Sequence, residues 1–227
     1  MRGLDSEGNW RTPFNPRASN HRNDDYCEGT AWQWTWFVPH DVDGLVELMG
    51  GRDAFIGKLD SLFTADSKLE GESTSVDISG MIGQYAHGNE PSHHIANLYN
   101  YVGQPWRTQE IVDEVLHTLY FNNPDGLSGN EDCGQMSAWY ILNAMGFYQV
   151  CPGKPVYSIG RPLFNEATVH LKDGKSFKVI AHNNSRDNKY VRSIVLNGNK
   201  LETPFFTHQD IVDGGTLELT MGSEPLK

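Results

Sequence analysis

The spacing of apolar residues divides the chain into a helical part and a strand-rich part. Up to about residue 153, apolar residues recur three and four positions apart, which indicates helices with one buried face. The predicted helices span residues 42–49, 53–63, 92–101, 108–121 and 134–145. Asp53 is expected to cap the second of them, and residues 67–77 are expected to form a polar loop.

The apolar period changes from helical to alternating after residue 153. The predicted strands span residues 167–171, 176–181, 190–196, 200–201 and 216–221. Asp173-Gly174 and Asn197-Gly198 are turn sequences, because these residues tolerate a positive φ. The chain is therefore predicted to be mainly α, with a helical domain over residues 1–153 and a small antiparallel β module over residues 154–227.

Three polar clusters precede helical or aromatic segments of the first part. Glu28 ends an acidic stretch before an aromatic run, Asn89 and Glu90 lie in a histidine-rich stretch, and Glu131 and Asp132 lie among glycines. Any one such cluster is explained by helix capping, since acidic residues favour a helix N-terminus. Three of them in one chain favour a binding site.

Carboxylates, amides and indoles together are typical of carbohydrate sites. Polar groups bond the ring hydroxyls, and aromatic faces pack on the apolar face of the sugar. The chain has 6 Trp and 9 Tyr, which supply such faces. Trp34 lies on the other side of the helical wheel from Trp32 and Trp36, so it is the candidate for a ligand surface while the others are expected in the core.

Hydrolysis of a glycosidic bond requires two carboxyl groups with different protonation states. The two groups stand ~6.5–9.5 Å apart in inverting enzymes and ~5–5.5 Å apart in retaining ones. Glu28 lies in a tryptophan-rich sequence, which is expected to raise its pKa and suit it as the acid. Asp132 lies beside Glu131 and amide donors, which suits it to stay ionised.

Three long blocks resemble glycoside hydrolase family 92, the calcium-dependent exo-α-mannosidases. They are RNDDYCEGTAWQWTWFVPHDVDGLVELMGG, GQYAHGNEPSHHIANLYNYVGQPW and GNEDCGQMSAWYILNAMGFYQVCPG. The resemblance covers nearly the whole chain and implies an inverting hydrolase of terminal α-linked mannose, with α-1,2 links of high-mannose N-glycans as substrates of many members. It assigns the general acid to Glu28 and the general base to Asp132. Some relatives have an acid where this chain has Asn130, which leaves an amide as the assisting group.

The same resemblance implies the fold and a metal. The chain is similar to the second half of an (α/α)6 toroid followed by a β module, so an N-terminal β-sandwich and the first half of the barrel are expected partners. Calcium prefers hard oxygen ligands, which favours Asn89 and Glu90. His87, His93 and His94 are then expected to bond sugar hydroxyls or to hold carboxylates in place.

Two other metal motifs are weaker. Adjacent His93 and His94 point in different directions on a helix and lack a further ligand at zinc spacing. The stretch from Asp41 to Gly44 has part of an EF-hand loop but no closing Glu, so Asp41 is expected to cap a helix.

Composition limits the possible partners. The net charge of −11 argues against nucleic acid and against an anionic membrane surface, and no apolar run reaches ~18 residues. The resemblance implies that the full-length protein is secreted, periplasmic or at the cell surface. Cys27 and Cys133 stand beside the proposed acid and base, and we expect small buried thiols there rather than cysteine–histidine chemistry.

Two alternatives to catalysis by this chain stay open. A non-catalytic carbohydrate-binding protein would use the same aromatics and amides without an acting carboxylate pair. A purely structural fragment would associate with a missing N-terminal part.

Overall fold

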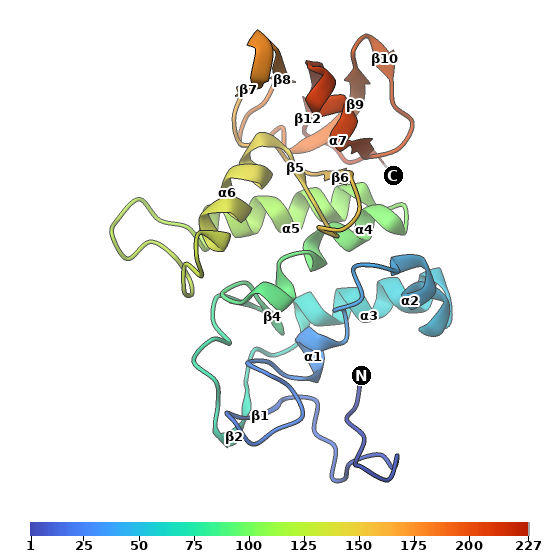
Figure 1. Ribbon diagram of the computed structural model, residues 1–227, viewed down its shortest axis with the longest axis vertical. Coiled ribbons are helices and arrows are strands. Elements are labelled where there is room, and N and C mark those ends of the chain that lie inside the picture. The colour runs from blue at the N-terminus through green and yellow to red at the C-terminus, as the bar shows by residue number, and fades with distance from the viewer. Residues whose placement is uncertain (227) are drawn as a thin grey trace. The chain divides into compact units, whose positions relative to one another are not determined.

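The computed structural model describes residues 1–226, and the chain folds into two compact units. The first unit comprises residues 1–93 and 121–136, and the second comprises residues 94–120 and 137–227. Figure 1 labels the elements of both units. The predicted domain boundary at residue 153 stays a prediction, because the two units reflect compactness alone and do not test it.

The first unit consists of short helices and strands joined by long loops (Figure 1). Its elements are β1 (Ala18–Asn20), α1 (Ala31–Trp34), α2 (Val42–Leu48), α3 (Arg52–Thr64), β2 (Glu70–Ser73), β3 (Met81–Ile82), β4 (Tyr85–Ala86) and the 3-10 turn η1 (Glu90–Ser92). β1 pairs in parallel with β2, and β3 pairs antiparallel with β4. β2 lies inside the segment predicted as a loop, because its fully exposed sequence lacks the alternation that marks a strand.

Aromatic packing forms the core of the first unit. Trp36 and Phe55 are fully buried, and their rings meet edge to face with centroids 5.3 Å apart. Asp41 caps α2, as predicted, by accepting a hydrogen bond from the Gly44 amide at 3.0 Å. Asp53 does not cap α3, because Gly51 with φ 97° is the N-cap and Asp53 falls in the first turn.

The second unit places helices beside a β module. Its helical elements are η2 (Ile95–Asn97), α4 (Leu98–Tyr101), α5 (Pro105–Thr118), α6 (Gln135–Met145, whose first two residues belong to the first unit), η3 (Lys172–Gly174) and α7 (His208–Asp213). Its strands are β5 (Phe147–Tyr148), β6 (Val156–Ile159), β7 (Glu166–His170), β8 (Ser176–His182), β9 (Tyr190–Leu196), β10 (Asn199–Lys200), β11 (Phe205–Thr207) and β12 (Gly215–Gly222). The single helix predicted over residues 92–101 is instead η1, η2 and α4.

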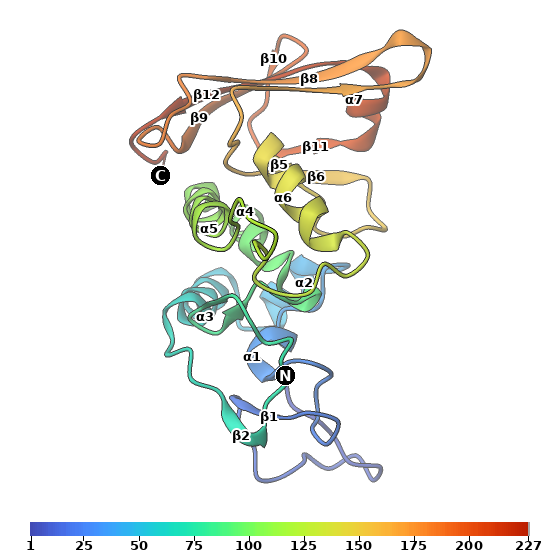
Figure 2. The same cartoon turned by 90° about the vertical axis from the view of Figure 1, so that its left-hand side faces the viewer.

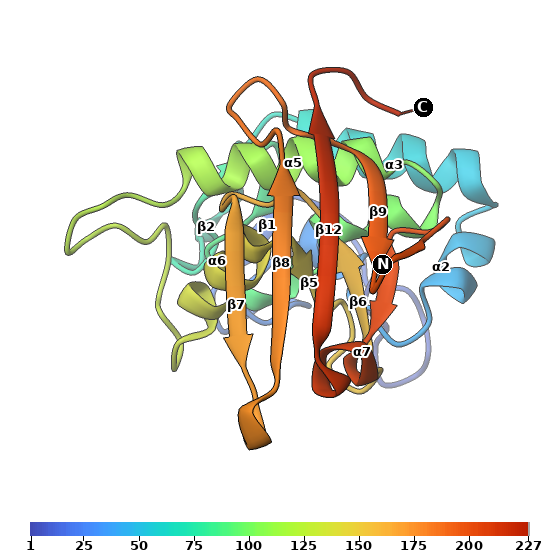
Figure 3. The same cartoon turned by 90° about the horizontal axis from the view of Figure 1, so that it is seen from above.

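A five-stranded sheet with the order β10-β9-β12-β8-β7 dominates the module. Figure 3 shows β7, β8, β12 and β9 side by side, and Figure 2 shows the length of β8 and β12. The predicted helical part and β module are both confirmed. The sheet is mixed, and not antiparallel throughout as was predicted, because β12 runs parallel to β8 and antiparallel to β9.

Alternating apolar residues of this sheet bury one face. Phe177, Leu217 and Leu219 are fully buried and pack with Phe147 and Phe206 in one hydrophobic cluster. Burying such a side chain contributes about 1.5–3 kcal/mol. This cluster supplies the main core of the second unit.

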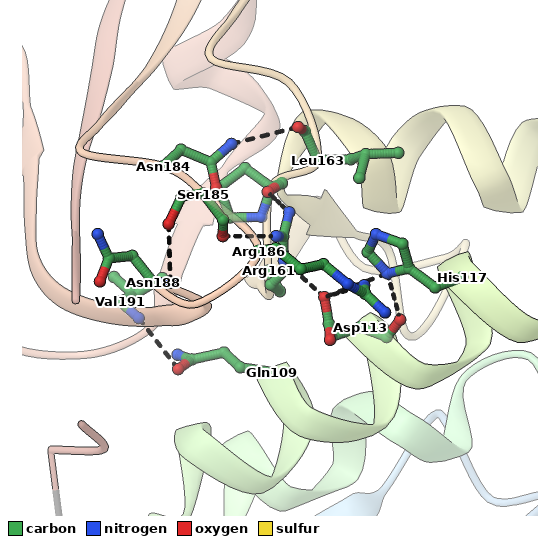
Figure 4. A network of polar contacts seen from close by, with 11 residues as sticks. Gln109, Asp113, His117, Arg161, Leu163, Asn184, Ser185, Arg186, Asn188 and Val191 are labelled. Atoms are coloured by element: carbon green, nitrogen blue, oxygen red, sulfur yellow. Dashed lines mark hydrogen bonds and ion pairs between the residues drawn. The ribbon is translucent and has the colours of Figure 1, made fainter. Parts of the chain in front are cut away.

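A buried ion pair joins α5 to loops of the β module (Figure 4). Asp113 on α5 forms an ion pair with Arg161 at 2.9 Å, and the more exposed Arg186 lies 3.6 Å from the same oxygen. The Asp113 carboxylate also lies 3.2 Å from Nδ1 of His117. Arg161 further donates to the Ser185 carbonyl at 3.1 Å. Burial lowers the pKa of Arg161, and the charge of Asp113 opposes that shift.

Candidate active site

The loop that carries Glu28 ends at the first residue of α1. Glu28 has a φ of 50°, a left-handed conformation that is uncommon outside glycine. Its backbone oxygen accepts a hydrogen bond from the Asn89 amide at 3.0 Å, and the same amide lies 3.5 Å from Oε2 of Glu28. The Glu28 side chain is exposed, so the enclosure expected for an acid is not supplied by these residues.

Trp34 also contacts the Glu28 loop. Its indole nitrogen donates to the Cys27 carbonyl at 2.9 Å. A Cβ atom on Gly29 would lie 2.6 Å from that nitrogen, so the indole packs directly on the loop backbone. Trp34 is half-buried and therefore has a positioning contact in addition to its predicted sugar-binding face, which stays a prediction.

The loop that carries Asp132 forms a left-handed turn before α6. Asp132, Cys133 and Gly134 have φ values of 47°, 58° and 94°. The carbonyl of Glu131 accepts from the amides of Gly134 at 3.1 Å and Met136 at 3.3 Å, which closes the turn. A non-glycine residue in this conformation costs roughly 1–2 kcal/mol, so contacts from outside the turn must hold it.

Two glycine backbones bring this loop against the histidine-rich segment. A Cβ on Gly129 would collide with the backbone of Gly88, and a Cβ on Gly88 would collide with the side chain of Ser79. Asn130 adds a hydrogen bond from its amide to the Asp77 carboxylate at 3.1 Å. Asn130 thus has a structural partner within the first unit.

Glu90 is the carboxyl group on which both proposed catalytic acids act. Burial raises the pKa of Glu90, a backbone hydrogen bond opposes this shift, and the charges of Asp132 and Glu28 and a hydrogen bond with Asp132 add to it. Two acids from separate loops therefore each act on Glu90 within the first unit. The sequence predicts a metal-binding role for Glu90 and gives no signal of this interaction.

His87 is buried inside the first unit, whereas His94 belongs to the second unit. His87 is fully buried, and burial together with the charge of His93 lowers its pKa well below the usual range. Its Nδ1 lies 2.8 Å from the Tyr85 hydroxyl. His94 belongs to the second unit, where it is buried at the start of η2. Because His87 is buried, it is better suited to hold neighbouring residues in place than to contact a sugar.

The structure adds a residue that sequence reasoning missed. Gln135, the first residue of α6, has its amide nitrogen 3.1 Å from Nδ1 of His93. Nε2 of His93 lies 2.9 Å from the carbonyl of His87. The sequence offers one signal for Gln135, which is its position three residues after Asp132.

The donor set at Glu90 is compatible with part of a calcium site. Carboxylate and amide oxygens are the hard ligands that calcium prefers, and the charges of two other acids act on Glu90, a repulsion that a divalent cation would reduce. Oδ1 of Asn89 already accepts from the Glu90 amide at 3.2 Å, which leaves its second lone pair. Among residues 1–226 no group of three or more His, Cys, Asp or Glu side chains is arranged to hold a metal. The described residues therefore supply only part of the ligands that a calcium site needs.

The cysteines differ from expectation in exposure. Cys27 and Cys133 are unpaired and exposed, because each lies in a loop with left-handed backbone and not on a buried helix face. A polar cavity of about 420 Å³ adjoins the Glu28 loop. It is lined by His21, Arg22, Asp24, Asp25, Tyr26, Cys27 and Glu28.

A site in which loop carboxylates from separate segments converge on one another is typical of acid–base hydrolases. Residues 1–223 match the model of the glycosyl hydrolase family 92 catalytic domain. The chain belongs to this glycosidase family.

Solved structures of the family resemble the whole chain. A family 92 α-mannosidase of Bacteroides thetaiotaomicron, solved with mannoimidazole, is 44% identical with a TM-score of 0.92, over 100% of this chain and 30% of that one. An inverting mannosidase of the same organism is 43% identical with a TM-score of 0.84, over 99% of this chain and 31% of that one.

A curated relative is more distant. An uncharacterized secreted glycosidase of Arthroderma benhamiae is 32% identical over 200 residues, which is 87% of this chain and 24% of the relative. The chain thus spans about a quarter to a third of the length of these relatives. No helix within residues 1–226 is long and apolar enough to cross a membrane.

Proposed function

We propose that these residues belong to an inverting, calcium-dependent exo-α-mannosidase that removes terminal α-1,2-linked mannose from high-mannose N-glycans. The observation that carries the proposal is that one segment, residues 88–90, contacts both candidate loops: the Asn89 amide donates to the Glu28 carbonyl at 3.0 Å, and Gly88 packs against Gly129. Two acids on independent loops that meet one segment suit a reaction that needs an acid and a base on opposite faces of a sugar. The mannosidases among the similar structures supply the sugar class.

In this proposal Glu28 donates a proton to the leaving glycosidic oxygen. Its loop is held by the Asn89 amide and by the Trp34 indole, so the carboxyl group has a defined starting position. Exposure of Glu28 allows a sugar to reach it. A positioned general acid typically contributes ~10²–10⁴-fold to the rate.

Asp132 takes a proton from the attacking water. Asn130 is tied to Asp77, so the assisting group two positions before the base is an amide that shapes the loop and carries no charge. The turn closed at the Glu131 carbonyl holds the backbone of Asp132. Attack by water without a covalent intermediate gives inversion at the anomeric carbon.

Calcium would be held by Glu90 and by Oδ1 of Asn89, with other ligands from water or from residues beyond this chain. When bound, it would supply positive charge that anchors the hydroxyls of the mannose ring. His87 and His93 would hold the segment that carries Asn89 and Glu90, since both are buried.

We also propose that further residues of the catalytic domain cover an apolar groove on the first unit. The groove has a volume of about 610 Å³, and Trp10 and Phe14 on it are 60% and 42% exposed. Exposed aromatic patches of this kind mark interaction surfaces. Relatives carry roughly two to three times as many additional residues as this chain has, in keeping with a partner from the same enzyme. Secretion is proposed from the curated relative's description.

The test follows α-1,2-linked mannobiose by proton NMR, with calcium and with excess chelator. The chain is assayed first by itself and then with the remaining portion of a family 92 catalytic domain supplied in trans. Calcium-dependent release with β-mannose as the first anomer is the expected result. Initial α-mannose, or release that is unchanged by the chelator, would contradict inversion or calcium dependence. Turnover in neither form would contradict the proposal.

Replacement of Glu28 by Gln separates catalysis from carbohydrate binding alone. The amide keeps the size and hydrogen bonding of the side chain but cannot donate the required proton. We expect turnover to fall by ~10²–10⁴-fold while mannobiose binding, measured by calorimetry, changes little. Unchanged turnover would remove Glu28 from the acid role, and binding without turnover in the unmodified protein would favour a carbohydrate-binding module.

A further inference from the structure

We infer that Gln135 is a positioning residue for Asp132, acting through His93. The inference rests on the proposed function, because Asp132 matters here as the general base. Gln135 lies three residues after Asp132 and is tied to a residue three positions after Glu90. The contact therefore connects the chain segments that carry two of the converging acids.

The hydrogen-bond partners define the form of the His93 ring. A carbonyl oxygen can only accept, so Nε2 of His93, at 2.9 Å from the His87 carbonyl, carries the hydrogen. In the neutral ring Nδ1 is then an acceptor, which suits the Gln135 amide at 3.1 Å. His93 is only 2% exposed, so both ring contacts are made inside the protein.

His93 is fixed with respect to Glu90. Its backbone amide donates to the Glu90 carbonyl at 3.0 Å, which closes the 3-10 turn η1. The ring in turn bonds the backbone of His87, whose own ring meets the fully buried Tyr85. The acceptor offered to Gln135 is thus connected to the core of the first unit.

Gln135 is equally fixed with respect to Asp132. Its backbone amide donates to the Asp132 carbonyl at 3.2 Å, so the two residues share one tight turn. That turn contains Asp132 and Cys133 with positive φ, a conformation that costs free energy. Gly129 and Asn130 hold the turn on its N-terminal side, and the bond to His93 holds it on the C-terminal side.

The consequence is a defined distance between the Asp132 carboxylate and Glu90. Loss of the Gln135 amide would let the turn relax without removing any carboxyl group. A displacement of about 1 Å at a reacting group can cost 10²-fold in rate. The effect is expected in kcat, because Gln135 bonds the protein and not the substrate in this arrangement.

The first experiment replaces Gln135 by Leu in the form of the protein that turns over mannobiose. We expect kcat to fall by about 10- to 100-fold while KM changes less than about threefold. Gln149→Leu is the matched control, since Gln149 also donates its amide to backbone carbonyls but lies in the second unit. A kcat for Gln135→Leu within twofold of the unmodified protein would overturn the inference, as would a rise in KM alone.

Two substitutions of His93 distinguish positioning from packing. Asn in place of His93 retains an acceptor near Nδ1 and loses the Nε2 donor, whereas Gln retains the donor and loses the acceptor. Positioning through Gln135 predicts a higher kcat for His93→Asn than for His93→Gln. Packing predicts the reverse order, because Gln is closer to His in volume, and that order would overturn the inference.

A spectroscopic readout separates this inference from the proposed function. Long-range proton–nitrogen NMR spectra report which ring nitrogen of His93 carries hydrogen. The Nε2–H form is expected, with an Nδ1 resonance that shifts in Gln135→Leu and not in Gln149→Leu. An unshifted resonance would show that the contact is absent, whatever the activity. Absence of turnover in every form, with the expected shift present, would contradict the proposed function and leave the contact established.

Discussion

The two units place their ionisable side chains in opposite ways. In the first unit burial raises the pKa of Glu90, and the like charges of Asp132 and Glu28 also raise it. In the second unit the carboxylate of Asp113 is compensated by Arg161 on a neighbouring loop. The first arrangement opposes folding and the second does not. Like charges held together in strained loops therefore indicate function, while compensated charges that join a helix to a loop indicate stability.

Replacement of Asp132 by Asn tests the first half of this comparison and has the largest expected effect. Turnover of mannobiose should fall by ~10²–10⁴-fold, because an amide cannot take a proton from water. The melting temperature should stay equal or rise, since one of the like charges around Glu90 is removed. Calorimetry and anomer-resolved NMR measure the two quantities. Asp125→Asn, in an exposed part of the same loop region, is the control, and a large loss of stability in Asp132→Asn would reverse our interpretation.

Replacement of Arg161 by Met tests the second half. The Arg161 side chain is 3% exposed, so its loss leaves the Asp113 carboxylate, 11% exposed, without its close partner. Breaking a buried pair on one side costs about 3–5 kcal/mol, which denaturant unfolding would detect. Arg186 approaches the same carboxylate but is 63% exposed. Arg186→Met should cost less than about 1 kcal/mol, and equal losses would show that burial does not determine the difference.

The sequence predicts the regular part of each unit better than the contacts that assemble the site. Apolar spacing correctly indicated α2, α3, α5 and α6, and alternation indicated the long strands of the module. It missed the short helix α7 and the short strands β5, β6 and β11, of which β11 pairs with the distant strand β6. The segment 92–101 has helical spacing, yet 3-10 turns satisfy the same spacing over so few residues.

The candidate site was predictable in its residues and not in its connections. Glu28 and Asp132 stand out because each lies in an acidic, glycine-containing stretch before aromatic residues. Their roles in catalysis stay predictions. The contact between Gly88 and Gly129 and the bond from Gln135 to His93 join segments about 40 residues apart in the sequence, so no local pattern reports them.

Replacement of Gly129 by Ala tests whether the Asp132 loop depends on the close approach of two backbones. The added methyl group would collide with the backbone of Gly88, which cannot yield as a flexible side chain would. We expect a loss of about 1–3 kcal/mol in stability and a lower kcat, because the Asp132 loop must move away from Glu90. Gly153→Ala meets no atom within 4 Å and should change stability by less than about 0.5 kcal/mol. A stable, fully active Gly129→Ala protein would contradict the proposed close approach.

The smallest expected effect concerns Tyr190 and Glu110, a pair in the second unit that bears charge only on the glutamate near neutral pH. The Tyr190 hydroxyl donates to Glu110 at 2.7 Å. Burial, followed by this hydrogen bond and the charge of Glu110, raises the pKa of Tyr190 to about 12. Since the unfolded state loses this proton near pH 10, the folded state binds more protons above that pH, and the free energy of unfolding should fall as the pH rises toward 12. Ultraviolet titration should show one tyrosine that ionises at a higher pH than the others, and this signal should be absent in Tyr190→Phe. Glu110→Gln should lower the pKa of Tyr190 without restoring the ordinary value, because burial is the larger cause. A Tyr190 that titrates with the exposed tyrosines would show that Glu110 does not stabilise the protonated form.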